Sequence, residues 1–132
     1  MMYLLDTNVC IHYLNGSSPA IREKLQTLHP ADIALCSVVK AELLTGARKS
    51  RYPEKTLANV RKFLAPFRSL PFDDVAAEIY GVVRADLERR GMPIGPYDLQ
   101  IASIALAHDL VLVTHNVQEF ARITGLRIED WE

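Results

Sequence analysis

The sequence predicts an α/β protein with a short, mainly parallel sheet that is covered by helices on both faces. Short apolar segments alternate with longer amphipathic segments along the whole chain. The short segments are continuous apolar runs and do not alternate between polar and apolar residues, which is typical of parallel strands buried on both faces. We expect strands at residues 3–5, 33–36 and 111–113, a short extended segment at 70–72, and a last edge strand at 126–128.

The helices are expected between these strands, at residues 9–14, 18–28, 37–49, 53–67, 73–90, 97–108 and 118–122. Ser18 and Pro19 mark a helix start, because serine is a good N-cap and proline suits the first helical position. Ser37 is the expected N-cap of the next helix. Asp73 or Asp74 is the expected N-cap of the helix at residues 73–90. Residues 97–108 are almost continuously apolar, which predicts a deeply buried helix.

Size and composition indicate one domain spanning residues 1–132, with 49% hydrophobic residues to form its core. The 15 basic and 16 acidic residues leave a net charge of −1. This balance argues against a protein held to nucleic acid by bulk charge alone. RNA is still allowed as a transient substrate, provided that a local basic surface or a metal ion neutralises the phosphate.

The two cysteines, Cys10 and Cys36, lie beside apolar runs and form no CxxC pair. Buried free thiols in a cytoplasmic protein are therefore expected rather than a disulfide. The N-terminus shows no basic region followed by a long apolar stretch, so no signal peptide is expected. No apolar run approaches the length of a bilayer span.

Candidate functional residues follow from a general rule: in open parallel sheets, ligands bind outside the carboxyl ends of the strands. The polar residues expected there are Asp6 after the first strand, Ser37 and Glu42 after the second, and Thr114, Asn116 and Glu119 after residues 111–113, with Asp98 in the first turn of the buried helix. Each has a structural alternative. Asp6 and Asp98 suit helix N-termini, Glu42 suits a solvated helix surface, and Asn116 with Glu119 suits a capping box.

Together these residues favour a metal site. Two carboxylates about 4 Å apart repel by about 4 kcal/mol at a protein-like dielectric, and a divalent cation removes that cost. Oxygen ligands alone suit Mg²⁺ or Mn²⁺, and the four histidines show no zinc-type spacing. Hydrolysis of a phosphodiester is the reaction class that such a site serves. The chain has no P-loop, GxGxxG or GxSxG motif.

Four segments resemble the PIN-domain nucleases in order and spacing: residues 4–8 (LLDTN), 37–43 (SVVKAEL), 95–102 (GPYDLQIA) and 113–116 (VTHN). They are most similar to the VapC toxins of bacterial toxin–antitoxin pairs, as is the ending IEDW at 128–131. The resemblance implies a three-layer α/β/α sandwich and an endoribonuclease that depends on Mg²⁺ or Mn²⁺. It also implies a cognate VapB-type antitoxin, a homodimer, contact with DNA only through the antitoxin, and an RNA substrate such as tRNA, initiator tRNA in particular.

By this resemblance Asp6, Glu42 and Asp98 are the metal-binding acidic core. Many members carry a fourth acid after the strand that corresponds to residues 111–113. Here Asn116 takes the place of an aspartate, and Glu119 is the nearest acid. We expect Glu119 to join the catalytic set, and we expect substrate contacts from Thr7, Asn8, Ser37 and Asn116.

Two other functions stay open from the residues alone. The first is a phosphatase or phosphoryl-acceptor domain with Asp6 as nucleophile. Members of the haloacid-dehalogenase group carry a second aspartate two residues on, where this chain has Asn8. The second is a non-catalytic binding module in which the carboxylates are helix caps and solvated surface.

Overall fold

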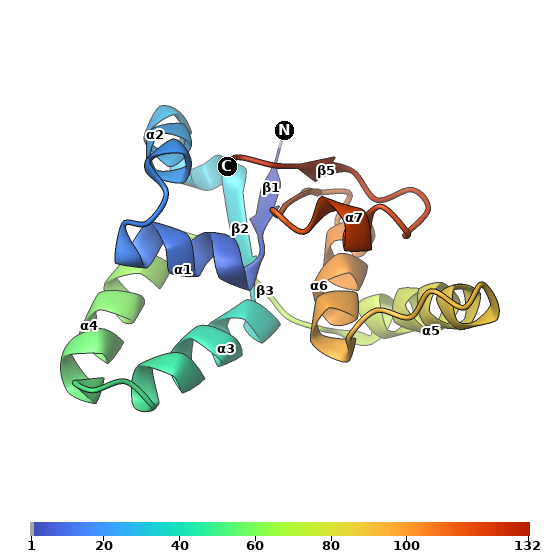
Figure 1. The fold of residues 1–132 in the computed structure, drawn as a ribbon, viewed down its shortest axis with the longest axis horizontal. Helices are drawn as coiled ribbons and strands as arrows, with labels where there is room; N and C mark the ends of the chain where they lie inside the picture. The colour runs from blue at the N-terminus through green and yellow to red at the C-terminus, as the bar shows by residue number, and fades with distance from the viewer. Residues whose placement is uncertain (1) are drawn as a thin grey trace.

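The computed structural model describes residues 2–132 and places a five-stranded parallel sheet at its centre (Figure 1). The strand order is β3-β2-β1-β4-β5, and every neighbouring pair is parallel. The strands are β1 (Tyr3–Leu5), β2 (Ile33–Cys36), β3 (Arg68–Leu70), β4 (Val111–Val113) and β5 (Ile128–Glu129). The predicted α/β class with a parallel sheet is confirmed.

Helices flank the sheet on both sides and complete the three-layer sandwich. In Figure 1, α1 to α4 lie on one side of the strands, and α5 and α6 lie on the other. Their bounds are α1 (Thr7–Asn15), α2 (Pro19–Thr27), α3 (Ser37–Arg48), α4 (Pro53–Leu64), α5 (Asp74–Arg89), α6 (Pro96–Ala107) and α7 (Val117–Phe120), with a 3-10 turn at Pro30–Asp32.

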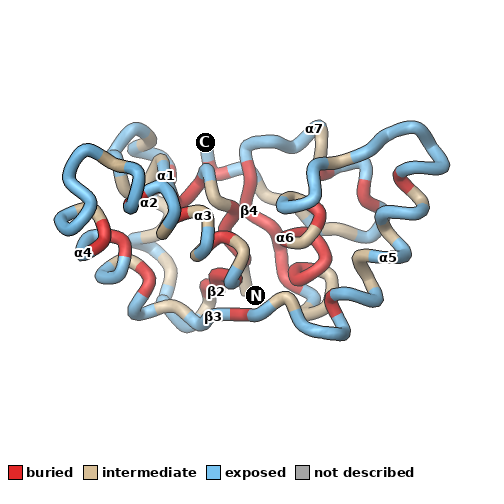
Figure 2. Tube along the Cα trace, turned by 90° about the horizontal axis from the view of Figure 1, so that it is seen from below, coloured by how far each residue is buried: buried red, intermediate tan, exposed pale blue. Residues whose placement is uncertain are grey.

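The core lies where the central strands meet α6, as the buried segments in Figure 2 show. Every residue of β2 and β4 is buried. Helix α6 is buried from Leu99 onward over most of its length, which confirms the prediction from its apolar sequence. Its buried polar residue, Ser103, donates its hydroxyl to the Leu99 carbonyl at 2.7 Å, so it is buried with a partner.

Several predicted bounds were wrong, and most have a local reason. The extended segment expected at 70–72 corresponds to β3 at Arg68–Leu70, which ends before Pro71 because proline has no N–H to donate to a ladder. The helix expected to reach residue 67 ends at Leu64, so that the chain can enter β3. The last strand is Ile128–Glu129 and not 126–128. Ser37 is the first residue of α3 and not its cap, a position taken by Cys36 without a side-chain bond.

The two cysteines are free and buried, as predicted. Within residues 2–132, no helix combines the length and the apolar character needed to cross a bilayer.

The sheet has a topological switch point between β1 and β4. The chain moves outward from β1 through β2 to β3 and then returns to pair β4 with the other side of β1. Helices that follow β1 and β4 therefore diverge, and the carboxyl ends of two such strands are the place where open parallel sheets generally bind ligands.

The fold predicts how truncations of the core act. Leu112 is 0% exposed in β4, and Leu112→Ala is expected to lower the free energy of unfolding by about 2–5 kcal/mol, because it leaves a cavity. Val82 is 71% exposed on α5, and Val82→Ala is expected to change it by less than about 0.5 kcal/mol. Urea denaturation measures both. Equal effects of the two variants would contradict this description of the core.

Candidate active site

Asp6 is the buried carboxylate at the carboxyl end of β1, only 6% exposed. Its backbone N–H donates to the Val113 carbonyl at 3.1 Å, which ties it to β4. Its side chain accepts from the Val9 N–H at 2.9 Å and caps α1. Burial raises the pKa of Asp6, while hydrogen bonds with Thr114 and Val9 lower it and the charges of Glu132 and Glu42 raise it. The interpretation of Asp6 as a helix N-cap is thus confirmed. Its carboxylate also lies at the switch point between β1 and β4.

Glu42 is a half-buried side chain of α3 that the structure ties to the start of α1. The Thr7 hydroxyl donates to Glu42 Oε1 at 2.8 Å, across 35 residues of sequence. Glu42 is therefore an oriented carboxylate and not a freely solvated one. Thr7 was expected to contact substrate, and in the structure its hydroxyl holds Glu42 in place.

Asp98 occupies the third position of α6, where the first turn favours a negative charge. The N-cap of α6 is Gly95, so Asp98 does not cap this helix. Half-burial raises the pKa of Asp98 to about 7, with further contributions from the charge and hydrogen bond of Glu119 and from the charges of Asp6 and Glu42. Asp98 therefore lies within electrostatic range of the other three predicted acids.

Asn116 and Glu119 do not form the expected capping box. The Asn116 side chain makes no cap hydrogen bond to α7. Its amide donates instead to Glu119 Oε2 at 2.7 Å, while its backbone N–H donates to the buried Thr114 hydroxyl at 3.1 Å. The pair therefore orients a carboxylate toward Asp98, which is the place predicted for the fourth acid.

The predicted metal ligands are close enough for their charges to act on one another, but they do not form a tight cluster. Among the described residues, the one set of three whose ligand atoms all lie within 4.8 Å of one another is His115, Asp130 and Glu132, and all three are exposed. Asp6, Glu42 and Asp98 do not form such a set, although their charges act on one another.

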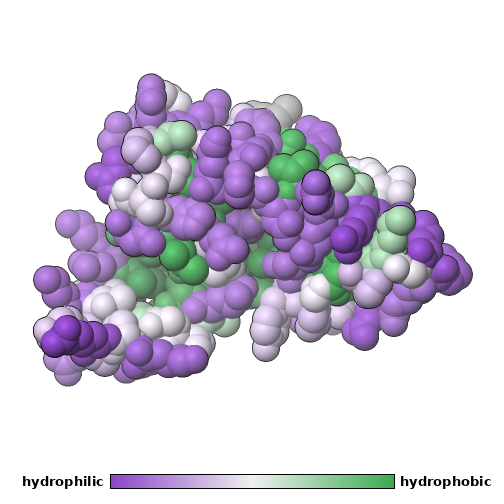
Figure 3. Space-filling view, in the orientation of Figure 1, coloured by the Kyte–Doolittle hydropathy of each residue, from purple (hydrophilic) through white to green (hydrophobic). Residues whose placement is uncertain are grey.

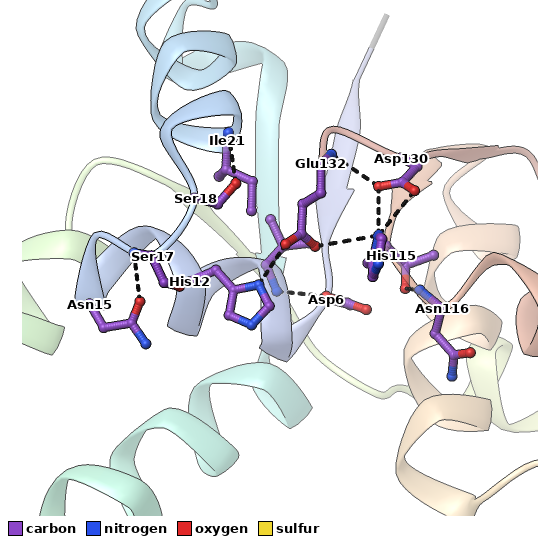
Figure 4. Close-up of polar contacts among 12 residues, drawn as sticks. Asp6, His12, Asn15, Ser17, Ser18, Ile21, His115, Asn116, Asp130 and Glu132 are labelled. Carbon is purple, nitrogen blue, oxygen red and sulfur yellow. Dashed lines mark hydrogen bonds and ion pairs between the residues drawn. The ribbon is translucent and has the colours of Figure 1, made fainter.

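Sequence reasoning missed the polar residues beside Asp6, shown in Figure 4. His12 Nδ1 lies 2.8 Å from Glu132 Oε1, and His115 Nδ1 lies 3.1 Å from Asp130 Oδ2. Partners that are 120 and 15 residues apart in sequence give no spacing signal. They meet because the chain end returns to the carboxyl edge of the sheet.

A groove of about 690 Å³ adjoins Glu42 between α3 and α6, and the surface is hollowed in this region in Figure 3. Ser37, Lys49, Phe72 and Tyr97 are among its lining residues. Ser37 and Asn8, two expected substrate contacts, are exposed. A groove with a lysine, exposed hydroxyls and an aromatic ring beside a carboxylate offers contacts for a polar polymer with planar bases.

Comparison with known proteins agrees with this arrangement. Residues 3–126 match the PIN domain. The tRNA(fMet)-specific endonucleases VapC of Salmonella typhimurium and Shigella flexneri are 43% and 40% identical to the chain over 131 residues, which cover 99% of this chain and 98% of each relative. The crystal structure of DNA-bound VapBC from Salmonella typhimurium matches with a TM-score of 0.94 and 42% identity, over 100% of this chain and 99% of that one.

The chain belongs to the PIN-domain family. Within that family it is a member of the VapC ribonucleases, as the resemblance of its four motifs predicted.

The raised pKa of Asp98 predicts a pH-dependent stability in metal-free buffer. An acid with a raised folded-state pKa binds its proton more tightly when folded, so the protein loses stability as pH rises from about 4 to about 7. Asp98→Asn removes this loss and is expected to make the protein more stable than wild type at pH 8, with the gain vanishing near pH 4. Urea denaturation in EDTA at both pH values measures it.

Asp74→Asn is the matched control, because Asp74 also lies in the first turn of a helix but is exposed. It changes the helix dipole interaction without relieving the acidic cluster. Equal pH dependence of stability in wild type and Asp98→Asn would show that the neighbouring acids do not raise the pKa of Asp98.

Proposed function

We propose that this VapC ribonuclease hydrolyses phosphodiester bonds in tRNA and depends on Mg²⁺ or Mn²⁺. One observation carries the proposal: burial and three neighbouring acids raise the pKa of Asp98 to about 7. A fold that gathers carboxylates at this cost in free energy is one that a divalent cation stabilises.

The donor set fits a hard divalent ion. Asp6, Glu42 and Asp98 offer carboxylate oxygens, which Mg²⁺ and Mn²⁺ prefer. Glu119 adds a fourth acid in contact with Asp98. When bound, such an ion lowers the pKa of a water and neutralises charge on a phosphate. Asp6, Glu42 and Asp98 would hold it, and Glu119 would complete the catalytic set.

The surrounding side chains fix these acids. Thr7 orients Glu42, and Asn116 orients Glu119, each through one hydrogen bond. A ligand with its own fixed partner keeps its geometry when substrate binds. We propose that exposed Asn8 and Ser37 contact the RNA, with Ser37 lining the groove beside Glu42.

The choice of tRNA rests on the relatives. Two proteins at 40% and 43% identity over nearly the full chain carry the name tRNA(fMet)-specific endonuclease. We propose tRNA as the substrate class, with initiator tRNA as the first member to test.

A VapB-type antitoxin is the proposed protein partner, and contact with DNA is proposed to occur only through it. The support is the similarity to DNA-bound VapBC and an apolar groove on this chain. The groove lies between α1, α3 and α4 and is lined in part by Ile11, Leu14, Leu43 and Val60. Ile11 is 40% exposed, so this surface offers an apolar helix or segment a place to bind. A homodimer is proposed from the family resemblance.

The phosphoryl-acceptor alternative has less support. A nucleophilic Asp6 needs access to substrate, whereas Asp6 is 6% exposed and accepts a hydrogen bond from Val9. A trapped aspartyl-phosphate would favour that alternative.

The nuclease proposal predicts the effect of isosteric changes at the acids. Asp6→Asn keeps a good N-cap, and Asp98→Asn keeps the side-chain shape. Each is expected to reduce cleavage of purified tRNA in Mg²⁺ by at least about 100-fold, because a metal ligand is lost. Gel assays of tRNA fragments measure the rate, and Asp74→Asn is expected to cleave at the wild-type rate. Cleavage at the wild-type rate by either site variant would refute the assignment.

Metal dependence has a readout that needs no RNA. Mg²⁺ or Mn²⁺ at 100 times its dissociation constant is expected to stabilise the wild-type fold by about 2.7 kcal/mol. The resulting rise in melting temperature is expected to disappear in Asp98→Asn and to persist in Asp74→Asn. Thermal unfolding with and without EDTA measures it, and an unchanged wild-type melting temperature would count against a metal site.

A further inference from the structure

The last three residues return to the carboxyl edge of the sheet and lie beside Asp6. Strand β5 pairs Glu129 with Val113 at the end of β4, so Asp130 comes next to the segment that follows β4. Trp131 is then buried at 7% exposure, packed edge-on against Tyr3 with ring centroids 5.3 Å apart. Its indole N–H donates to Glu129 Oε1 at 3.0 Å. This anchor fixes the position of the residue that follows it.

Glu132 places its carboxylate between two imidazole rings. Its Oε1 lies 2.8 Å from His12 Nδ1, and its Oε2 lies 3.9 Å from His115 Nδ1. The side chain of Glu132 is only 16% exposed. Asp130 holds the second ring more closely, with its two oxygens 3.1 and 3.2 Å from His115 Nδ1, and it also accepts the Glu132 N–H at 3.0 Å. Figure 4 shows the two rings on either side of Glu132.

Both histidines therefore use Nδ1 for a carboxylate and leave Nε2 for another ligand. The side chains of His12 and His115 are 36% and 64% exposed, so solvent or substrate can reach them. A carboxylate at Nδ1 orients the ring, and a proton on Nε2 then makes that atom a donor. The hydrogen bond and charge of Asp130, with the charge of Glu132, raise the pKa of His115.

The two rings come from the elements that flank the acidic site. His12 lies on α1, the helix that Asp6 caps, and His115 lies between Thr114 and Asn116 at the end of β4. The charge of Glu132 raises the pKa of Asp6, and Asp6 in turn acts on His115. The histidines therefore lie close to the acids but are not part of the acidic cluster.

The two histidines would favour the binding of an RNA backbone beside the acids. A phosphate that approaches Asp6, Glu42, Asp98 and Glu119 meets negative charge, and the whole protein has a net charge of −1. Imidazolium donors on the rim offset this repulsion through charge-assisted hydrogen bonds, which are about twice as strong as neutral ones.

We propose that His12 and His115 bind one backbone phosphate of the RNA through their Nε2–H groups, with Glu132 and Asp130 as the residues that position them. The proposal rests on the proposed ribonuclease function and adds a phosphate-binding site to it. It assigns the chain end a part in substrate binding.

The test uses the full chain with His12→Asn and His115→Asn. Each variant is expected to raise KM for cleavage of bulk tRNA in Mg²⁺ about tenfold, as for loss of one charge-assisted hydrogen bond, with kcat changed less than twofold. The double variant is expected to reduce the slope of log KM against log NaCl concentration by about 0.7–0.9, the contribution of one neutralised phosphate, and each single variant is expected to reduce it by a part of that amount.

Controls separate a phosphate contact from simple anchoring of the tail. His108→Asn removes an equal side chain at the far end of α6 and is expected to leave KM and slope unchanged. His115→Arg keeps a cation and is expected to retain the salt slope that His115→Asn loses. Glu132→Gln keeps a hydrogen-bonding side chain without its charge and is expected to raise KM less than His12→Asn does.

The outcomes distinguish this proposal from the ribonuclease proposal. If wild type cleaves tRNA while both Asn variants keep its KM and salt slope, the phosphate site is refuted. If wild type cleaves no RNA in Mg²⁺ or Mn²⁺, the ribonuclease proposal fails. Filter binding of intact tRNA in Ca²⁺ then decides on the site, because a reduced salt slope in both Asn variants supports it and an unchanged slope refutes it.

Discussion

A carboxylate held almost out of water at the end of the central strand constrains the rest of this molecule. Burying a charged group costs free energy unless hydrogen bonds or opposite charge offset the loss of water. At Asp6 the Val9 N–H, the Thr114 hydroxyl and the N-terminus of α1 provide that offset. Because β1 is the middle strand, the same residue also joins β4 through its backbone N–H.

The other acids are positioned from this centre. Thr7 follows Asp6 directly and fixes Glu42 on α3, while the segment after β4 fixes Glu119 through Asn116. Asp98 lies at the start of the buried helix α6 and receives their combined repulsion. Capping of α1 is therefore compatible with the metal-binding role proposed for Asp6, since its hydrogen bond from Val9 leaves the carboxylate at the switch point of the sheet.

The sequence revealed those parts that depend on neighbouring residues. Continuous apolar runs followed by polar residues predicted β1, β2 and β4 and, with them, Asp6 and Glu42 as candidates. The extended segment expected at 70–72 overlaps β3 only at Leu70, because Pro71 has no N–H and is a poor member of a ladder. The capping box at Asn116 failed for another reason. Glu119 accepts from the side-chain NH2 of Asn116, and the Asn116 backbone N–H, which Glu119 would accept in a capping box, donates to the Thr114 hydroxyl instead.

The parts that sequence did not reveal depend on long-range register. No local pattern links Thr7 to Glu42 or His12 to Glu132, since these contacts span 35 and 120 residues. The second contact exists only because β5 pairs Glu129 with Val113. A shift of one residue in that pairing would send the following side chains to the opposite face.

The short last strand explains why Trp131 matters for the site. Two paired residues in β5 are too few to fix a chain end by themselves. The buried indole, in contact with Tyr3, supplies the missing apolar contact, and its position decides where Glu132 lies. Asp6 is thus set by the first strand, whereas Glu132, which contacts His12 and lies near His115, is set by the last. In the proposed function, a phosphodiester that enters between the acids and the histidines would meet carboxylates on one side and imidazole donors on the other, which is the charge distribution that a polyanionic substrate requires.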